Sequence, residues 1–131
     1  MKKFYLIDDD TIFVFLTRKT LQVANLSTDL TVFEDGKKAL LDLELSANQP
    51  ELLPDVIFLD LNMPVLDGWG FLEEYSLLEP KMSKKIEIYI VSSSISPSEL
   101  ERSQRIPVVT DFLTKPLSRS KFVEIFDGAE V

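Results

Sequence analysis

The sequence contains no cysteine and no histidine, and these two absences exclude several kinds of chemistry. Without cysteine there can be no disulfide bond, no thiolate metal site and no thiol nucleophile. Without histidine there is no histidine general base, no Ser-His-Asp triad and no imidazole metal ligand. Any metal ion that the chain binds must therefore be a hard cation held by oxygen atoms.

Positive charge and long apolar runs are also scarce. The 131 residues include 22 acidic and 14 basic side chains, and the resulting net charge of -8 disfavours binding to nucleic acid. No apolar stretch approaches the roughly 20 residues that a membrane helix requires, so we expect no membrane segment and a cytoplasmic protein. Hydrophobic residues make up 45% of the chain, which is enough for the core of one domain.

Five short apolar runs alternate with five helical patterns along the chain. The runs, which we predict to be strands, cover residues 3–7, 30–34, 56 up to the carboxylate at 60, 86–91 and 107–113. The helices are expected over residues 11–24, 37–45, 69–78, 97–105 and 119–126. Such alternation predicts an α/β fold, in which a five-stranded parallel sheet carries helices on both faces.

Two of these helices carry more detailed signals. Ser96-Pro97-Ser98-Glu99 has the pattern of a capping box with proline at the first helical position, so the fourth helix should begin there. In the first helix, a shared arc at 3.6 residues per turn predicts the buried face, which contains Ile12, Phe13, Leu16, Thr20, Val23 and Ala24. Val14 and Phe15 then point away from the core, either as a docking spot beside the neighbouring acids or as ordinary surface residues.

Polar side chains follow the predicted strands. Asp8 and Asp9 come after the first strand, Asp60 after the third, Ser92 after the fourth and Lys115 after the fifth. Each has an ordinary explanation by itself, since a strand-ending aspartate often caps the next turn and a serine cluster is often a loop. All strands of a parallel sheet end at one edge, however, and that edge is where ligands bind. The coincidence predicts a site there.

The predicted cluster has a chemical consequence. Three carboxylates within a few ångströms repel one another by about 4 kcal/mol per pair at 4 Å and an effective dielectric near 20. One lysine cannot neutralise them, whereas Mg²⁺ can, and it keeps positions open for phosphate oxygens. Lys115 supplies a second positive charge and Ser92 a hydroxyl donor, which together favour phosphoryl transfer with Asp60 as the nucleophile.

The motifs LIDDD, DLNMPVLDGWG, IVSSS and Lys115-Pro116 together resemble those of a response-regulator receiver domain, the chemotaxis-type phosphoacceptor module of two-component signalling. The resemblance covers nearly the whole chain. It implies a flavodoxin-like, doubly wound fold with strand order 2-1-3-4-5. It also implies one stand-alone domain over residues 1–131, with a core at about 3–127 and no output domain.

The resemblance also assigns roles to individual residues. Asp60 accepts phosphate from the phosphohistidine of a histidine kinase or a histidine phosphotransfer protein. Mg²⁺ or Mn²⁺ is bound by Asp9, Asp60 and the backbone carbonyl of Asn62, with Asp8 in its outer shell. Ser92 is the switch hydroxyl, Lys115 pairs with the phosphoryl group, and the peptide bond before Pro116 is cis. Phe112 is either the switch aromatic or a permanently buried core residue.

The function expected from this resemblance is a phosphorelay receiver whose output is protein binding or onward phosphotransfer. It is not a turnover enzyme, although hydrolysis of its own aspartyl phosphate is compatible with the site. One alternative is a receiver-like interaction module that works without phosphorylation. A phosphoaspartyl phosphatase is disfavoured because Asn62 stands where that chemistry needs a second acid, and flavin binding is disfavoured because Asp8, Asp9 and Asp10 would repel its phosphate.

Overall fold

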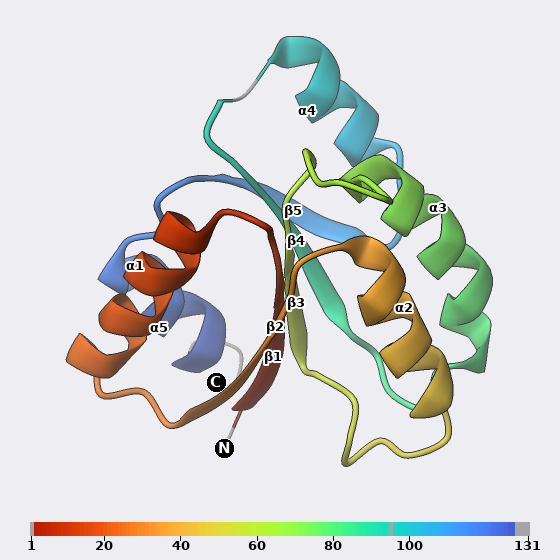
Figure 1. Cartoon of the computed structure of the whole chain (residues 1–131), viewed down its shortest axis with the longest axis horizontal. Coiled ribbons are helices and arrows are strands. Elements are labelled where there is room, and N and C mark those ends of the chain that lie inside the picture. Colours follow the sequence, from red (N-terminus) through yellow and green to blue (C-terminus); the bar gives the residue numbers. More distant parts are fainter. Residues whose placement is uncertain (1, 95, 128–131) are drawn as a thin grey trace.

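A computed structural model describes residues 2–94 and 96–127 of the chain. Its centre is one parallel sheet in the order β2-β1-β3-β4-β5 (Figure 1), which confirms the predicted class and strand order. The strands are β1 (Lys2–Ile7), β2 (Thr28–Phe33), β3 (Val56–Leu59), β4 (Glu87–Ser92) and β5 (Val109–Thr114). All five predicted strands exist, and their boundaries differ from the prediction by a few residues.

Helices cover both faces of this sheet (Figure 1). They are α1 (Thr11–Val23), α2 (Gly36–Leu45), α3 (Gly68–Leu78), α4 (Pro97–Gln104) and α5 (Arg119–Asp127), with a short 3-10 turn η1 (Glu79–Lys81) after α3. α1 and α5 pack on one face, while α2 and α3 pack side by side on the other. α3 ends before Pro80, as predicted, because proline cannot continue the α-helical hydrogen-bond pattern.

The sheet separates two apolar cores. Because successive side chains of a strand point to opposite faces, Phe4 and Leu6 of β1 enter the core beneath α1 and α5, while Tyr5 and Ile7 enter the core beneath α2 and α3. All four residues of β3 are buried, as expected for a central strand covered on both faces. These packed layers fix the strands rigidly, so the strand ends are held in place.

The predicted inner face of α1 is correct at Phe13 but wrong at Ile12, Leu16 and Val23. The buried residues of this helix are Phe13, Thr17 and Leu21, whereas Ile12 is 71% exposed and Leu16 and Val23 are also exposed. Five consecutive apolar residues, 12–16, leave the phase of the helix undetermined, and the true stripe passes through a polar threonine. Val14, expected on the surface, is half-buried against the core beneath α1, so only Phe15 of the predicted pair is exposed.

Short polar side chains cap the helices where the chain leaves the sheet. The Ser96 hydroxyl accepts a hydrogen bond from the Glu99 backbone at 3.1 Å and donates to the Glu99 carboxylate, which confirms that α4 begins at this predicted cap. Asp10 caps α1 by accepting bonds from the backbone of Ile12 and Phe13. Asp10 is therefore engaged in the helix start, and Asp8 and Asp9 remain for the edge of the sheet.

Candidate functional site

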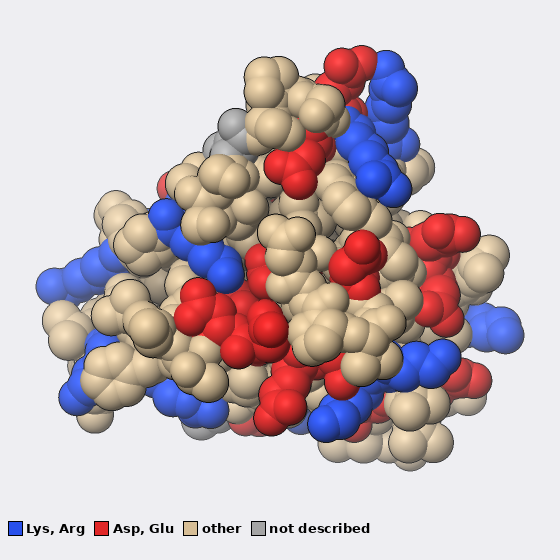
Figure 2. Space-filling view, turned by 45° about the horizontal axis from the view of Figure 1, so that its top comes forward, with Lys and Arg blue, Asp and Glu red and all other residues tan. Residues whose placement is uncertain are grey.

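Three carboxylates meet at the carboxyl edge of the sheet. β1 pairs with β3, with Ile7 opposite Leu59, so the residues that follow these strands are neighbours. Asp8, Asp9 and Asp60 each offer an oxygen, and these oxygens lie within 4.8 Å of one another. Figure 2, which turns this edge toward the viewer, shows acidic side chains gathered there. Asp8 and Asp60 are buried and Asp9 is exposed, so the cluster opens to solvent on one side.

Lys115 reaches this cluster from the end of β5. Its Nζ atom lies 2.8 Å from Oδ2 of Asp8 and 3.6 Å from Oδ1 of Asp60. The same ammonium lies 4.5 Å from the centre of the Phe13 ring, and the Lys115 backbone N–H donates to the Ser92 carbonyl at 2.8 Å. The peptide bond between Lys115 and Pro116 is cis, as the resemblance implies. The structure thus brings together the acids and the lysine that the sequence singled out.

The electrostatics of the cluster favour an additional cation. Burial, and after it the Asp8 charge, raise the pKa of Asp60 to about 6, although Lys115 and the Asn62 backbone N–H act in the opposite direction. Burial also raises the pKa of Asp8, although Lys115 and the Asp10 backbone oppose this effect. One lysine therefore does not compensate the charge that the two buried carboxylates carry at neutral pH.

The donor atoms fit a divalent metal ion. Among the described residues, Oδ2 of Asp8 is buried and accepts no hydrogen bond, although the Lys115 ammonium lies close to it. Oxygens from three carboxylates that lie within 4.8 Å of one another are the ligand chemistry of Mg²⁺ and Mn²⁺. Asp8, Asp9 and Asp60 of the predicted ligand set thus fit such an ion, while the Asn62 carbonyl stays a prediction.

Ser92 and Phe112 occupy the neighbouring strand ends. The Ser92 side chain is buried, and its hydroxyl donates to the Ser94 carbonyl at 2.8 Å. Phe112 lies opposite Ile90 in the β4–β5 pairing and packs into the core beneath α2 and α3. In this structure the Phe112 ring therefore points inward, and the Ser92 hydroxyl is held by its own loop.

Sequence reasoning missed how tightly the loop after Asp60 is built. A Cβ atom at Gly68 would lie 2.5 Å from the Asp60 carbonyl oxygen and 2.7 Å from Cα of Leu61, so only glycine fits there. Val65 has a positive φ of 68°, and the Leu66 N–H donates to the Pro64 carbonyl at 2.7 Å, which closes a γ-turn. The Asp67-Gly68 pair was visible as a turn signal, but its approach to Asp60 was not.

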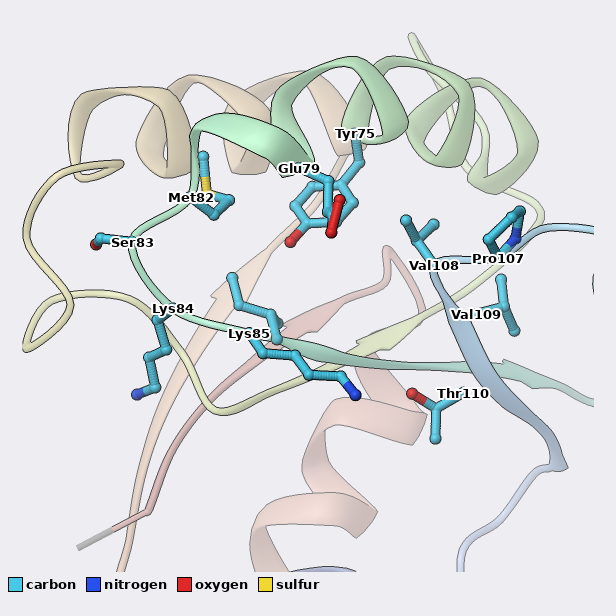
Figure 3. Close-up of a pocket in the computed structure, with 11 residues that line it drawn as sticks. Tyr75, Glu79, Met82, Ser83, Lys84, Lys85, Pro107, Val108, Val109 and Thr110 are labelled. Carbon is cyan, nitrogen blue, oxygen red and sulfur yellow. The ribbon is translucent and has the colours of Figure 1, made fainter.

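A cavity of about 650 Å³ lies away from this site, at the amino ends of β4 and β5 (Figure 3). Its lining includes Tyr75, Met82, Lys85, Val108 and Thr110. None of the clustered acids contributes to it, so the cavity is separate from the candidate site. The basic loop 81–85, which borders this cavity, was expected to be solvated surface, and its Lys81, Ser83 and Lys85 are exposed.

The fold and the acidic edge together define a doubly wound α/β protein with a carboxylate cluster at the carboxyl ends of its strands. The family model for the response regulator receiver domain matches residues 4–127. The chain therefore belongs to the response regulator receiver domain family. Proteins of this family are signalling modules that receive phosphoryl groups from histidine kinases or phosphotransfer proteins, and they bind a divalent metal ion at an acidic pocket.

The chain is also similar to individual proteins in sequence or in fold. A peroxide stress-activated histidine kinase, mak3 of Schizosaccharomyces pombe, is 26% identical over 121 residues, which are 92% of this chain and only 5% of the kinase. The crystal structure of a two component response regulator from Cytophaga hutchinsonii has a TM-score of 0.85 and 23% identity, over 99% of this chain and 97% of that one. The phosphorylated cyanobacterial phytochrome response regulator RcpA has a TM-score of 0.75 and 28% identity, over 98% and 91%.

In the part of the chain that the structure describes, no helix has the length and apolar character that crossing a membrane would require.

Proposed function

We propose that this chain is a phosphoacceptor in a two-component phosphorelay and that Asp60 carries the phosphoryl group. The observation that supports this proposal most directly is the position of Asp60 between two aspartates and Lys115. The family membership supplies the class of reaction, and the geometry supports Asp60 as the reacting carboxylate. Asp8 lies closer to the ammonium, at 2.8 Å, whereas Asp60 follows the central strand and lies beside Asp8, Asp9 and Lys115.

The proposed reaction transfers a phosphoryl group from a phosphohistidine of a partner protein. A carboxylate oxygen of Asp60 attacks phosphorus, the new O–P bond forms as the N–P bond breaks, and the electron pair stays on the imidazole, which takes up a proton. The Lys115 ammonium, 3.6 Å from Asp60, stabilises the negative charge of the transferred group. A divalent ion held by Asp9, Asp60 and the Asn62 carbonyl, with Asp8 in the outer shell, would neutralise the phosphoryl oxygens when bound.

Ser92 and Phe112 would couple this reaction to a partner. The phosphoryl group adds acceptor oxygens beside Ser92, whose hydroxyl now donates to Ser94 and could be redirected toward it. Phe112 is already inward in this structure, so its switching role requires an outward position in some other state. A phosphorylation-dependent change near β5 and α4 would then alter what this face binds.

The exposed apolar residues at the start of α1 suit the docking of the phosphodonor. Phe15, Ile12 and Leu16 are exposed on the helix that follows the acidic cluster, so an apolar partner surface placed there would lie beside the site. Val14 is half-buried and packs against the core beneath α1, so it offers a partner little contact area. The downstream target is expected to be a protein.

Mass measurement of the intact chain after treatment with acetyl phosphate tests the proposal. We expect one phosphate per chain in the presence of Mg²⁺, and none when EDTA replaces the metal or when Asp60→Asn is used. Glu51→Gln, an exposed acid on a loop, serves as the control and should be labelled like the parent. A chain that takes no phosphate under any condition would favour the phosphorylation-independent interaction module, and labelling of the Asp60 variant would show that another residue reacts.

A further inference from the structure

The outer surface of the α2–α3 layer carries an apolar groove that the phosphoacceptor site does not use. It encloses about 220 Å³, and its lining consists of four residues from α2 and four from α3 and η1: Lys37, Leu40, Leu41, Glu44, Glu74, Leu77, Leu78 and Lys81. Leu41 is 53% exposed and Leu77 is 77% exposed, although both are large apolar residues. The centre of the groove is thus apolar and exposed to solvent. The charged residues of its lining stand at its two ends.

The two walls of the groove have the same spacing and the opposite order of charge. Each wall uses positions i, i+3, i+4 and i+7, which form one face of a helix. On α2 the order is lysine, two leucines and glutamate, from Lys37 to Glu44. Along α3 and η1 it is glutamate, two leucines and lysine, from Glu74 to Lys81. In both walls the leucines lie midway between the charges.

The directions of the helices decide how such a surface can pair with itself. α2 and α3 each lead from the carboxyl end of one parallel strand back to the start of the next, so they run in the same direction (Figure 1). Each end of the groove therefore has one lysine and one glutamate. Within the described chain, none of these four charges lies within 4 Å of an opposite charge, so the ion pairs that they could form inside one molecule are not made.

We propose that the α2–α3 groove is the contact between two copies of this chain, related by a two-fold axis perpendicular to both helices. Such an axis lays α2 antiparallel on α2 of the second copy, and α3 on α3. Lys37 then meets Glu44 of the other copy, and Glu74 meets Lys81, while Leu41 and Leu77 meet their own counterparts at the centre. The same rotation satisfies all four charges, as a closed two-fold contact requires.

A second copy explains this pattern better than an unrelated partner does. The four charges sum to zero and complement themselves under a two-fold rotation, and the charge-exchange variants below distinguish the axis proposed here from one parallel to the helices. The whole chain has a net charge of -8 that would otherwise oppose self-association. The groove lies on the face of the sheet opposite α1, so the contact leaves Phe15 free for a phosphodonor. Two short helical walls bury little surface, so we expect a weak dimer with a Kd on the order of 100 μM.

Sedimentation velocity over a range of concentrations measures this equilibrium directly. The parent chain should shift from monomer toward dimer between about 10 and 500 μM, in line with a Kd of that order. Leu77→Asn should weaken the dimer by at least tenfold without changing the far-UV circular dichroism. Val23→Asn, at an exposed apolar position at the end of α1, is the matched control and should dimerise like the parent.

Charge exchange identifies the orientation of the contact. Lys37→Glu alone should weaken the dimer, because the introduced carboxylate would face Glu44 of the other copy. The pair Lys37→Glu with Glu44→Lys exchanges charges along α2 and should restore it. The pair Lys37→Glu with Glu74→Lys exchanges charges across the groove and should not, because it places like charges opposite each other at every contact. Both double variants have the composition of the parent.

Each experiment has a result that would contradict the proposal. A chain that remains monomeric at 500 μM, or a dimer that Leu77→Asn leaves unchanged, would overturn the proposal. Equal behaviour of the two double variants would overturn the antiparallel two-fold arrangement that the proposal specifies. Neither result bears on whether Asp60 accepts phosphate, since phosphate uptake is measured separately from the mass of the single chain.

Discussion

Asp60 is kept in a charged cluster that the folded chain stabilises only in part. Burial and the Asp8 charge raise its pKa to about 6, whereas an unfolded chain leaves an aspartate near its ordinary value. A carboxylate whose pKa rises on folding is less stable when ionised in the native state than in the unfolded state. At neutral pH, and without a metal, the Asp60 charge therefore lowers the stability of the protein.

The substitution Asp60→Asn should consequently stabilise the metal-free protein. At pH 7 in EDTA we expect its free energy of unfolding to rise by about 1 to 3 kcal/mol, because the amide removes the uncompensated charge at nearly constant volume. The sign follows from linkage, since a raised pKa means that the native state gains stability as the pH falls from about 6 toward 4. Urea denaturation measures the effect, and the gain should shrink toward pH 4.

Glu51→Gln removes an exposed loop charge and should change the free energy of unfolding by less than about 0.5 kcal/mol. If Asp60→Asn destabilised the metal-free chain, the Asp60 charge would not lower the stability of the native state as inferred.

The start of α3 controls the position of Asp60 at the level of secondary structure. The Gly68 N–H donates to the Leu61 carbonyl at 3.0 Å, and Asp67 caps the helix by accepting from the Gly70 backbone at 2.8 Å. The helix therefore begins directly against the backbone that carries the phosphoacceptor. The close approach needs a residue without Cβ at position 68, although glycine is a poor helix former elsewhere.

Gly68→Ala should destabilise the protein by about 2 kcal/mol or more, even though alanine is the better helix former. Its Cβ would meet backbone atoms at 2.5 and 2.7 Å, which cannot yield without moving Asp60 or Leu61. Gly70→Ala is a matched control on the same turn, because its Cβ would meet the flexible end of Leu66. That variant should be neutral or slightly stabilising in thermal denaturation. Equal stability of the two variants would contradict the tight approach at Gly68.

The whole molecule uses the two edges of its sheet differently. At the carboxyl edge, carboxylates of like charge gather at the site. At the amino edge, groups of opposite charge link neighbouring segments of the chain. There Asp55 accepts a hydrogen bond from the Lys3 backbone at 2.9 Å and lies 2.6 Å from the Lys84 ammonium, so one side chain connects segments beside β1, β3 and β4. Burial raises the pKa of Asp55, but Lys84 and the Lys3 N–H outweigh burial, and the pKa lies below its ordinary value.

The stability of the whole chain should therefore depend on Asp55 in a pH-dependent way. A carboxyl with a lowered pKa contributes stability above its unfolded pKa and loses that contribution as the pH falls through the folded value. We expect Asp55→Asn to lower the free energy of unfolding by about 1 to 2 kcal/mol at pH 7. The difference from the parent should shrink progressively below about pH 4.

Chemical denaturation at pH 7, 5 and 3 checks this expectation. Asp29→Asn removes a more exposed carboxylate 3.8 Å from Lys3, and its effect should stay small at every pH. A difference for Asp55→Asn that is constant from pH 7 to 3 would show that its ionisation is not linked to folding.

Much of the fold and of the site was predictable because it depends on local patterns. Periodicity placed all five strands and helices, and the polar residues after the strands identified the acids and Lys115. The buried face of α1 was not predictable in this way, because residues 12–16 are all apolar and the true stripe includes Thr17. The packing of the helix against α5 and the sheet selected its phase.

The sequence by itself determined the chemistry that is available to this protein. Histidine and cysteine are absent, and Asp8, Asp9, Asp60 and Lys115 each follow an apolar run, so the sequence offered oxygen ligands and an ammonium at the predicted strand ends. Only the tertiary structure decided the distances between those groups, the rise in the Asp60 pKa and the groove between α2 and α3. These properties arise from burial and from contacts between segments distant in the chain, which no local pattern of residues encodes.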